Sequence, residues 1–285
     1  MNPVLQSLAY VFVSCILLFL SKVLFDKILL FKSSEEIKKG NSAAIISFAG
    51  YIFGISAVLI GAFIGPSAKN FGFDLLLYAS YAVAGMAFML ASGLIVDKMM
   101  FPGFDCKKEI LEDRNIGMGA VYFGFYIATG LIVSACVTGD YGGILSSVIY
   151  YFAGMALMFL FLKVYDKIAP YSIHGEIEKD NYAAGIALSG NIIAIGLILM
   201  KATLADMSDI KGSIILYLID LSAIFLLLPA ARFILGNFIF RKVKINNEIE
   251  KNNVSAGIAE FVSIVCFALF IFFMIDFAAA VKGLQ

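Results

Sequence analysis

Long apolar stretches separated by short polar linkers make up most of the chain. Each stretch is long enough to cross about 30 Å of hydrocarbon as an α-helix, which rises about 1.5 Å per residue. The pattern therefore predicts an all-α membrane protein with eight transmembrane helices. The predicted spans cover residues 3–25, 42–65, 73–97, 116–138, 143–166, 182–204, 212–236 and 253–276.

The linkers that alternate with these spans differ in charge. All but four of the 21 Lys and Arg residues lie in or beside the linkers that follow the first, third, fifth and seventh spans. Because basic residues near short loops resist translocation, we expect these linkers to be cytoplasmic and both termini to lie outside. Acidic residues are mixed with the basic ones there, which argues against nucleic-acid binding. We expect Ser33–Lys39 and Ser172–Lys179 to form short amphipathic pieces along the lipid bilayer.

Two sets of positions recur along the chain. The even-numbered spans begin with related strings at residues 36–44, 110–117, 176–184 and 248–256. The odd-numbered spans repeat Tyr10, Tyr81, Tyr150 and Tyr217, and three of them end in an Asp-Lys pair, at Asp26, Asp97 and Asp166. We expect four two-helix repeats in parallel orientation, arranged as two four-helix halves over residues 1–139 and 140–285.

The string Glu-Ile-x-Lys-x-Asn-x-Ala-Ala, clearest at residues 36–44 and 176–184, opens a helix that contains glycines. This motif resembles the uncharacterised bacterial inner-membrane family typified by YjfL, in which a short two-helix domain occurs in tandem. The resemblance covers essentially the whole chain and implies a multi-pass protein of the bacterial inner membrane. The family has no settled biochemical function, so the resemblance implies no activity.

The repeated helix-start motif allows two interpretations. An asparagine at the start of an apolar helix can cap it by accepting from free N–H groups of the first turn. Alternatively, several helix N-termini converge on a cytoplasmic anion or headgroup site, which requires the four repeats to face one another. The motif residues are Glu36, Asn41, Asn115, Glu176, Asn181, Glu248 and Asn253.

Two acidic residues, Asp220 and Glu260, lie well inside apolar stretches. Insertion of a carboxylate at such a depth costs on the order of 2.5 kcal/mol or more, so it should be neutralised, paired or placed beside a wet cavity. Both acids belong to the fourth repeat, and the positions equivalent to Glu260 are Phe48, Tyr122 and Leu188. A proton or cation relay and a hydrogen-bonded packing role both stay open; Tyr217 and Asn191 are candidate partners.

Composition narrows the function. The chain is 61% hydrophobic and 15% charged, whereas soluble domains average about 45–50% and about 25%. We find no catalytic signature, and Cys106, His174 and the remaining cysteines form no metal-binding pattern, so we expect no enzymatic activity, cofactor or metal. The first span lacks a basic leader and a cleavage site, and we expect it to be retained.

Two functional hypotheses follow. The first is a channel or small transporter for ions, protons or small solutes that uses Asp220 and Glu260. The second is a membrane scaffold that recruits a cytoplasmic protein partner or organises lipid during envelope stress. A homo-oligomer is compatible with both.

Overall fold

The computed structural model describes residues 2–29, 31–100, 105–138, 143–168, 171–204, 218–219, 222, 226, 229–234 and 238–274. Every regular element in these residues is helical. Seven helices are long and apolar enough to cross a membrane. They are α1 (Pro3–Ile28), α3 (Ser42–Ile64), α4 (Phe71–Met100), α6 (Ile116–Thr138), α7 (Gly143–Ile168), α9 (Tyr182–Leu204) and α12 (Val254–Met274).

The all-helical membrane architecture is therefore as predicted. The seventh predicted span, 212–236, lies mostly outside the described residues. The helices α1 and α4 continue three residues beyond the predicted ends because an Asp-Lys pair does not stop a helix. A lysine in the last turn suits the negative end of the helix dipole, and its long side chain keeps the charge in water.

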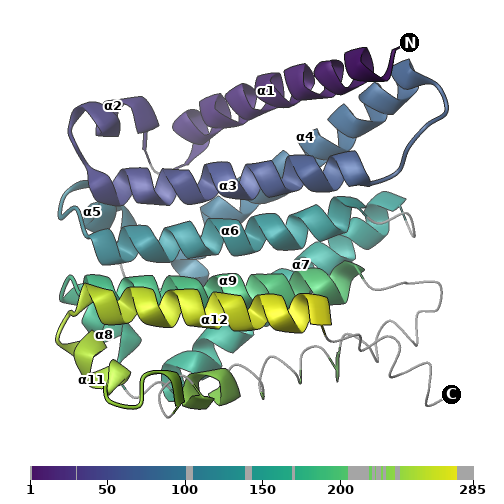
Figure 1. Cartoon of the computed structure of the whole chain (residues 1–285). Helices are drawn as coiled ribbons and strands as arrows, with labels where there is room; N and C mark the ends of the chain where they lie inside the picture. The colour runs from purple at the N-terminus through teal and green to yellow at the C-terminus, as the bar shows by residue number, and fades with distance from the viewer. Residues whose placement is uncertain are drawn as a thin grey trace, which may run out of the picture.

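Four of the long helices, α3, α6, α9 and α12, stand side by side in this order (Figure 1). Glycines let their backbones touch. A Cβ atom added to Gly50 would lie 2.4 Å from Phe123 Cα, one on Gly185 would lie 2.3 Å from the Gly117 carbonyl oxygen, and one on Gly257 would lie 2.5 Å from the Ala183 carbonyl oxygen. We call these four helices the row. Membrane helices gain van der Waals contact in this way, because lipid provides no hydrophobic drive for their association.

The helices α4 and α7 form a second layer against the row. The helix α4 packs on both α3 and α6, and α7 packs on both α6 and α9. We call each contact between neighbouring row helices a seam. At the first seam, between α3 and α6, a Cβ on Gly85 of α4 would lie 2.3 Å from Val58 of α3 and 3.4 Å from Val133 of α6. The two inner row helices are thereby almost wholly buried, whereas α1, α3, α4, α7 and α12 expose many large apolar side chains.

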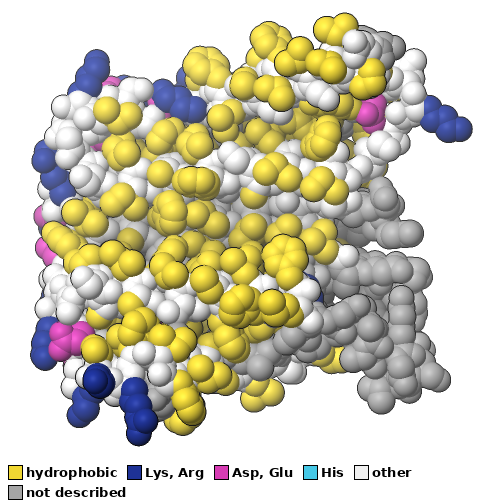
Figure 2. All heavy atoms as spheres, viewed as in Figure 1, with side chains coloured by type: hydrophobic (Ala, Val, Ile, Leu, Met, Phe, Trp, Pro, Cys, Tyr) yellow, Lys and Arg dark blue, Asp and Glu magenta, His cyan; other side chains and the backbone are white. Residues whose placement is uncertain are grey.

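Four short helices gather beside the N-terminal ends of the row helices (Figure 1). They are α2 (Ser33–Lys38), α5 (Cys106–Leu111), α8 (Ile173–Glu178) and α11 (Ile245–Glu250). Short helices, α2 and α8, form where the two amphipathic pieces were predicted, and their position along the bilayer stays a prediction; the sequence pattern made no prediction for α5 and α11. Figure 2 shows that basic and acidic side chains collect at this end, while apolar side chains cover the face between the two ends.

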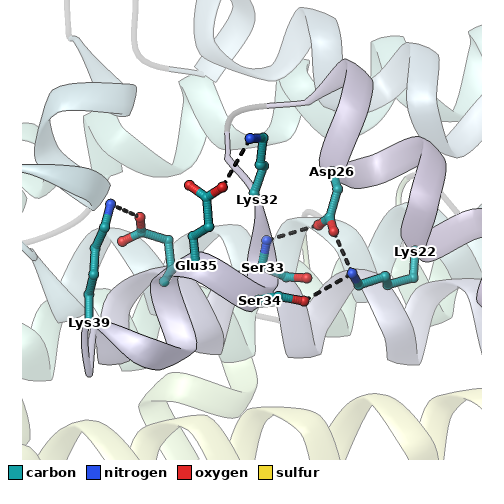
Figure 3. Close-up of polar contacts among 8 residues, drawn as sticks. Lys22, Asp26, Lys32, Ser33, Ser34, Glu35 and Lys39 are labelled. Carbon is teal, nitrogen blue, oxygen red and sulfur yellow. Dashed lines mark hydrogen bonds and ion pairs between the residues drawn. The ribbon is translucent and has the colours of Figure 1, made fainter.

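Charged side chains shape the connection from α1 to α2. Asp26 accepts a hydrogen bond of 2.8 Å from the Ser33 N–H and pairs with Lys22 at 2.5 Å (Figure 3). The carboxylate thus satisfies a free N–H group at the start of α2. The lysine that pairs with Asp26 is Lys22, one turn earlier in α1.

Candidate functional site

The repeated asparagines cap the row helices. The side-chain oxygens of Asn41, Asn115 and Asn181 accept from the N–H groups of residues three positions later, at 3.2, 2.9 and 2.9 Å. Asn253 accepts from the Ser255 N–H at 3.2 Å. The capping interpretation is confirmed at all four positions.

Each asparagine amide also donates to a carboxylate of the polar segment that precedes its row helix; we call this segment the connector. The distances from Nδ2 to Oε2 are 2.9 Å for Asn41 and Glu36, 2.8 Å for Asn181 and Glu176, and 3.0 Å for Asn253 and Glu248. The carboxylates are held in turn by lysines, for example Lys39 at 2.6 Å from Glu36. Burial alone would raise the pKa of Glu36, but the hydrogen bonds from Lys39 and Asn41 outweigh it and hold the pKa below its ordinary value.

In the second repeat the carboxylate is Glu109, which the sequence analysis did not identify. Asn115 Nδ2 donates to Glu109 Oε2 at 3.0 Å. Glu109 lies six residues before its asparagine, whereas Glu36 lies five residues before Asn41, so a fixed spacing misses it. The residue before each asparagine has positive φ: Gly40, Arg114, Asp180 and Asn252, at 66°, 56°, 57° and 59°. This shared backbone turn is a better signal than the spacing.

The amides also connect neighbouring repeats. Asn41 Nδ2 donates to the carbonyl oxygen of Ile110 at 2.9 Å, Asn115 to that of Ile177 at 2.8 Å, and Asn181 to that of Ile249 at 2.8 Å. The row helices lie side by side and do not face a common centre (Figure 1). This arrangement is a linear row, not the ring that a shared anion site would require.

The relay candidates fall into two groups. Asp220 and Tyr217 lie outside the described residues. Glu260 is buried, with 3% of its surface exposed, and it pairs with Arg232 at 2.9 Å. Asn191 Nδ2 lies 3.3 Å from the same carboxylate oxygen. The structure therefore brings Glu260 and Asn191 together, and it adds Arg232, which sequence reasoning had treated only as a cytoplasmic charge.

Arg232 lies between the buried Glu260 and the exposed Asn246. Its guanidinium stands 5.2 Å from the Tyr165 ring centroid, and its Nη2 lies 3.4 Å from Oδ1 of the exposed Asn246. Among the described residues, neither Glu260 Oε2 nor Arg232 Nε has a hydrogen-bond partner. Tyr171 is buried beside them; burial raises its pKa above the ordinary value, Glu260 raises it further and Arg232 lowers it.

The same place in the first repeat is apolar. Counted from the repeated motifs, Phe25 is equivalent to Arg232 and Phe48 is equivalent to Glu260. The rings of Phe25 and Phe48 pack edge to face with centroids 5.1 Å apart. The fold thus accepts an aromatic pair at this position, and the ion pair of the fourth repeat is not required by the architecture.

The second repeat has a different polar pair at this level. Tyr122, which is equivalent to Glu260, donates to Asp97 of α4. The Tyr122 side chain is fully buried, and Cys106 of α5 is buried nearby. Within the described residues, no cluster of three or more histidine, cysteine, aspartate or glutamate side chains could hold a metal ion.

Comparison with known proteins places the chain in a family. The model of a domain of unknown function, DUF350, matches twice, over residues 1–137 and 140–275. A UPF0719 transmembrane protein of Aquifex aeolicus (strain VF5) is 25% identical over 251 residues, 84% of this chain and 88% of that protein. The UPF0719 transmembrane protein YshE of Bacillus subtilis (strain 168) is 31% identical over 136 residues, 47% of this chain and 94% of its own length.

No solved structure matches the chain. The YjfL-type name given to the resemblance is not confirmed by these matches, which support an uncharacterised membrane family. The chain belongs to the DUF350 family of transmembrane proteins.

Proposed function

We propose that this protein moves protons or small ions across the bacterial inner membrane, with Glu260 as the group that binds the ion. The observation that carries the proposal is the buried ion pair between Glu260 and Arg232, at 2.9 Å, in a place where the first repeat holds two phenylalanines. Ionisable groups inside membrane spans are costly, and they mark ion pathways and proton relays in many membrane proteins.

In the proposed topology the protein has eight spans in four parallel repeats, with the charged end in the cytoplasm and both termini outside. The collection of Lys and Arg at the end that carries the short helices supports this orientation. The seams of the row are closed by backbone contacts at Gly50, Gly185 and Gly257. The pathway therefore runs beside the row, between α9, α12 and the helical residues 229–234.

The contacts of Arg232 provide a step for the transfer. A proton that binds Glu260 Oε2, for which no described residue provides a hydrogen bond, removes the negative charge that holds Arg232. The guanidinium then keeps two polar partners, the buried Tyr171 and the exposed Asn246 at 3.4 Å. Loss of the proton restores the ion pair, so occupancy of Glu260 is coupled to the position of Arg232.

Proton flux into liposomes that contain an entrapped pH-sensitive dye tests the proposal. We expect a loss of at least tenfold in Glu260→Gln and in the double variant Arg232→Phe/Glu260→Phe, which restores the aromatic pair of the first repeat. Asp220→Asn tests the second acid, and Glu178→Gln is the control because Glu178 is exposed outside the spans. Unchanged flux in Glu260→Gln/Asp220→Asn would exclude both acids from the mechanism.

A scaffold that recruits a cytoplasmic protein is the second candidate, favoured by the exposed lysines that repeat along the short helices. Beside the N-terminal ends of the row helices, a lysine pairs with the connector carboxylate in three repeats, at Lys39, Lys179 and Lys251. The glutamates are poor test positions because they also hold the asparagines. Charge reversal of the three lysines should abolish partner capture and leave flux unchanged if the scaffold is the function.

A further inference from the structure

The row has two unpaired ends. In the inner seams, each row helix presents a forward face to the next helix and a backward face to the preceding one. The forward face of α3 includes Gly50 and Gly54, and the backward face of α6 includes Phe123 and Gly130. Among the described helices, α12 has no successor for its forward face, and α3 has no predecessor for its backward face.

At the first end, a groove of about 440 Å³ lies between α1 and α3, with Tyr78 of α4 also in its lining. Ser14 and Leu18 line it from α1, and Ser56 and Ile60 line it from α3. By the repeat, Ser14 and Leu18 are equivalent to Gly85 and Met89 of α4.

The surroundings of Gly85 and Met89 show which helix fills the equivalent space in the second repeat. Gly85 faces Val58 of α3, and Met89 faces Gly54 of α3, so α3 lies in the corresponding space between α4 and α6. A further row helix, preceding α3, would therefore occupy the groove.

At the other end, the forward face of α12 is exposed. Val262 is 50% exposed, and Phe270 and Phe273 are 55% and 78% exposed. Counted from the asparagines, Phe270 is equivalent to Val58, which faces Gly85 at the first seam. Phe270 is thus the side chain that would meet Ser14 in the groove.

The hydrogen bonds that join neighbouring repeats also lack a partner at the two ends of the row, among the described residues. Asn41, Asn115 and Asn181 each donate to a carbonyl of the following repeat. Asn253 is exposed, and within the described residues its amide donates only to Glu248. At the other end, Ile37 is 58% exposed, although its equivalents, among them Ile110 and Ile177, are fully buried.

We propose that this protein associates head to tail, with α12 of one copy seated in the groove between α1 and α3 of the next. The interface continues the one that the chain itself repeats at three seams. The half-length relative from Bacillus subtilis supports this view, because a chain that matches 136 residues holds about half of the row. Such a heterologous contact closes into a ring or continues as a filament.

The contact differs from the inner seams in the size of its side chains. Ile45 stands where Gly119, Gly185 and Gly257 stand in the other row helices, and Val262 replaces a packing glycine. The backbones therefore stay further apart than within one copy, and the groove provides the room for Phe270 and Phe273. The association is accordingly weaker than the seams inside the chain.

Disulfide cross-linking in native membranes tests the proposal. Cysteines are placed by Ser14→Cys and Phe270→Cys in a background with Cys15→Ala and Cys266→Ala. The equivalent residues at the first seam, Gly85 and Val58, are in contact, so the two introduced thiols face each other across the proposed interface. The helices α1 and α12 lie at opposite ends of the row (Figure 1), so every such bond joins two copies.

We expect oxidation to give dimers and larger multiples from the double-cysteine protein. Two single-cysteine proteins, Ser14→Cys and Phe270→Cys, should give dimers only when they are mixed. The pair Phe12→Cys and Phe270→Cys is the matched control, because Phe12 is 67% exposed on α1 and does not line the groove. A second test pair is Leu18→Cys with the native Cys266, in a background in which only Cys15 is replaced by alanine. Leu18 is equivalent to Met89, and Cys266 is equivalent to Gly54.

The outcomes separate the occupants of the groove. Cross-links in both test pairs and few in the control support the second copy. Monomers in both test pairs mean that lipid or another protein covers the groove, and they overturn the proposal. Equal cross-linking in the control means random collision, and dimers from Phe270→Cys alone mean a symmetric contact; either result also overturns it. Flux measurements are independent of these bands, so the proposed function stands or fails separately.

Discussion

Asn41 and Ile110 belong to adjacent repeats, and the side-chain amide of Asn41 donates a hydrogen bond of 2.9 Å to the main-chain carbonyl of Ile110. Ile110 is fully buried in the described structure. A carbonyl at the end of a short helix has no intrahelical partner, and burial without one costs about 1–3 kcal/mol. The asparagine therefore satisfies a carbonyl of the next repeat while it caps its own helix.

Replacement of an inner asparagine should cost more than replacement of the last one. Asn115→Ala removes a cap and the donor to the Glu109 carboxylate, and it leaves the Ile177 carbonyl with only the Asp180 N–H at 3.1 Å, so we expect a loss of about 1–3 kcal/mol. Asn253→Ala removes an exposed cap and an exposed hydrogen bond to Glu248, and we expect about 0.5–1 kcal/mol. Thermal unfolding of the purified protein in detergent measures both. Equal losses would contradict the role of the inner asparagines in joining repeats.

The sequence predicts this part of the fold well for a physical reason. The apolar lengths determine the spans, and a polar residue at the start of an apolar helix has few roles other than capping. The partners across the row could not be predicted, because the carbonyls of Ile110 and Ile177 leave no mark in the identity of the side chains. Arg232 was missed as a partner of Glu260 since their contact joins residues 28 positions apart through tertiary packing.

Glycines at the seams should tolerate no side chain. A Cβ on Gly185 would lie 2.3 Å from the Gly117 carbonyl oxygen, which is main chain and has no room to move aside. We expect Gly185→Ala to destabilise the protein by about 1–3 kcal/mol. Gly175→Ala is the control, because its nearest neighbour is the Ser172 hydroxyl at 3.2 Å; the change should be within about 0.5 kcal/mol. A loss at Gly175 as large as at Gly185 would contradict the close packing.

The connector carboxylates should make stability depend on pH. The pKa of Glu36 lies below its ordinary value of 4.5, since the hydrogen bonds from Lys39 and Asn41 outweigh burial. A depressed pKa gives stability that is present above 4.5 and is lost as the pH falls through the folded-state pKa. We expect the apparent Tm to fall in that window, and to fall less in Glu36→Gln. Glu250→Gln, at an exposed position, should keep the pH dependence of the unchanged protein.

Cys106, in the short helix α5, should react slowly for a thiol outside the spans. Burial raises the pKa of the Cys106 thiol to about 11, and the thiolate is the reactive form. We expect alkylation by N-ethylmaleimide at pH 7.5 to be at least tenfold slower than at a cysteine introduced by Lys107→Cys in a Cys106→Ser background. Lys107 is exposed on the same short helix. Similar rates at the two positions would show that α5 opens readily.

The ion pair of the fourth repeat should cost stability when only one partner is removed. Glu260→Gln leaves the Arg232 guanidinium without its carboxylate, and Arg232→Phe leaves the Glu260 carboxylate without its cation. Breaking a buried pair in this way costs about 3–5 kcal/mol. Thermal unfolding of the two single variants in detergent, compared with the unchanged protein, measures each loss.

The double variant Arg232→Phe/Glu260→Phe should recover most of that loss. The first repeat already accommodates Phe25 and Phe48 at the equivalent positions, and a buried ion pair is often replaced by packed apolar side chains without a net loss. A double variant that folds as stably as the unchanged protein but conducts no protons would separate the two roles of the pair. If the single losses simply add in the double variant, Arg232 and Glu260 do not depend on each other, and the coupled relay is wrong.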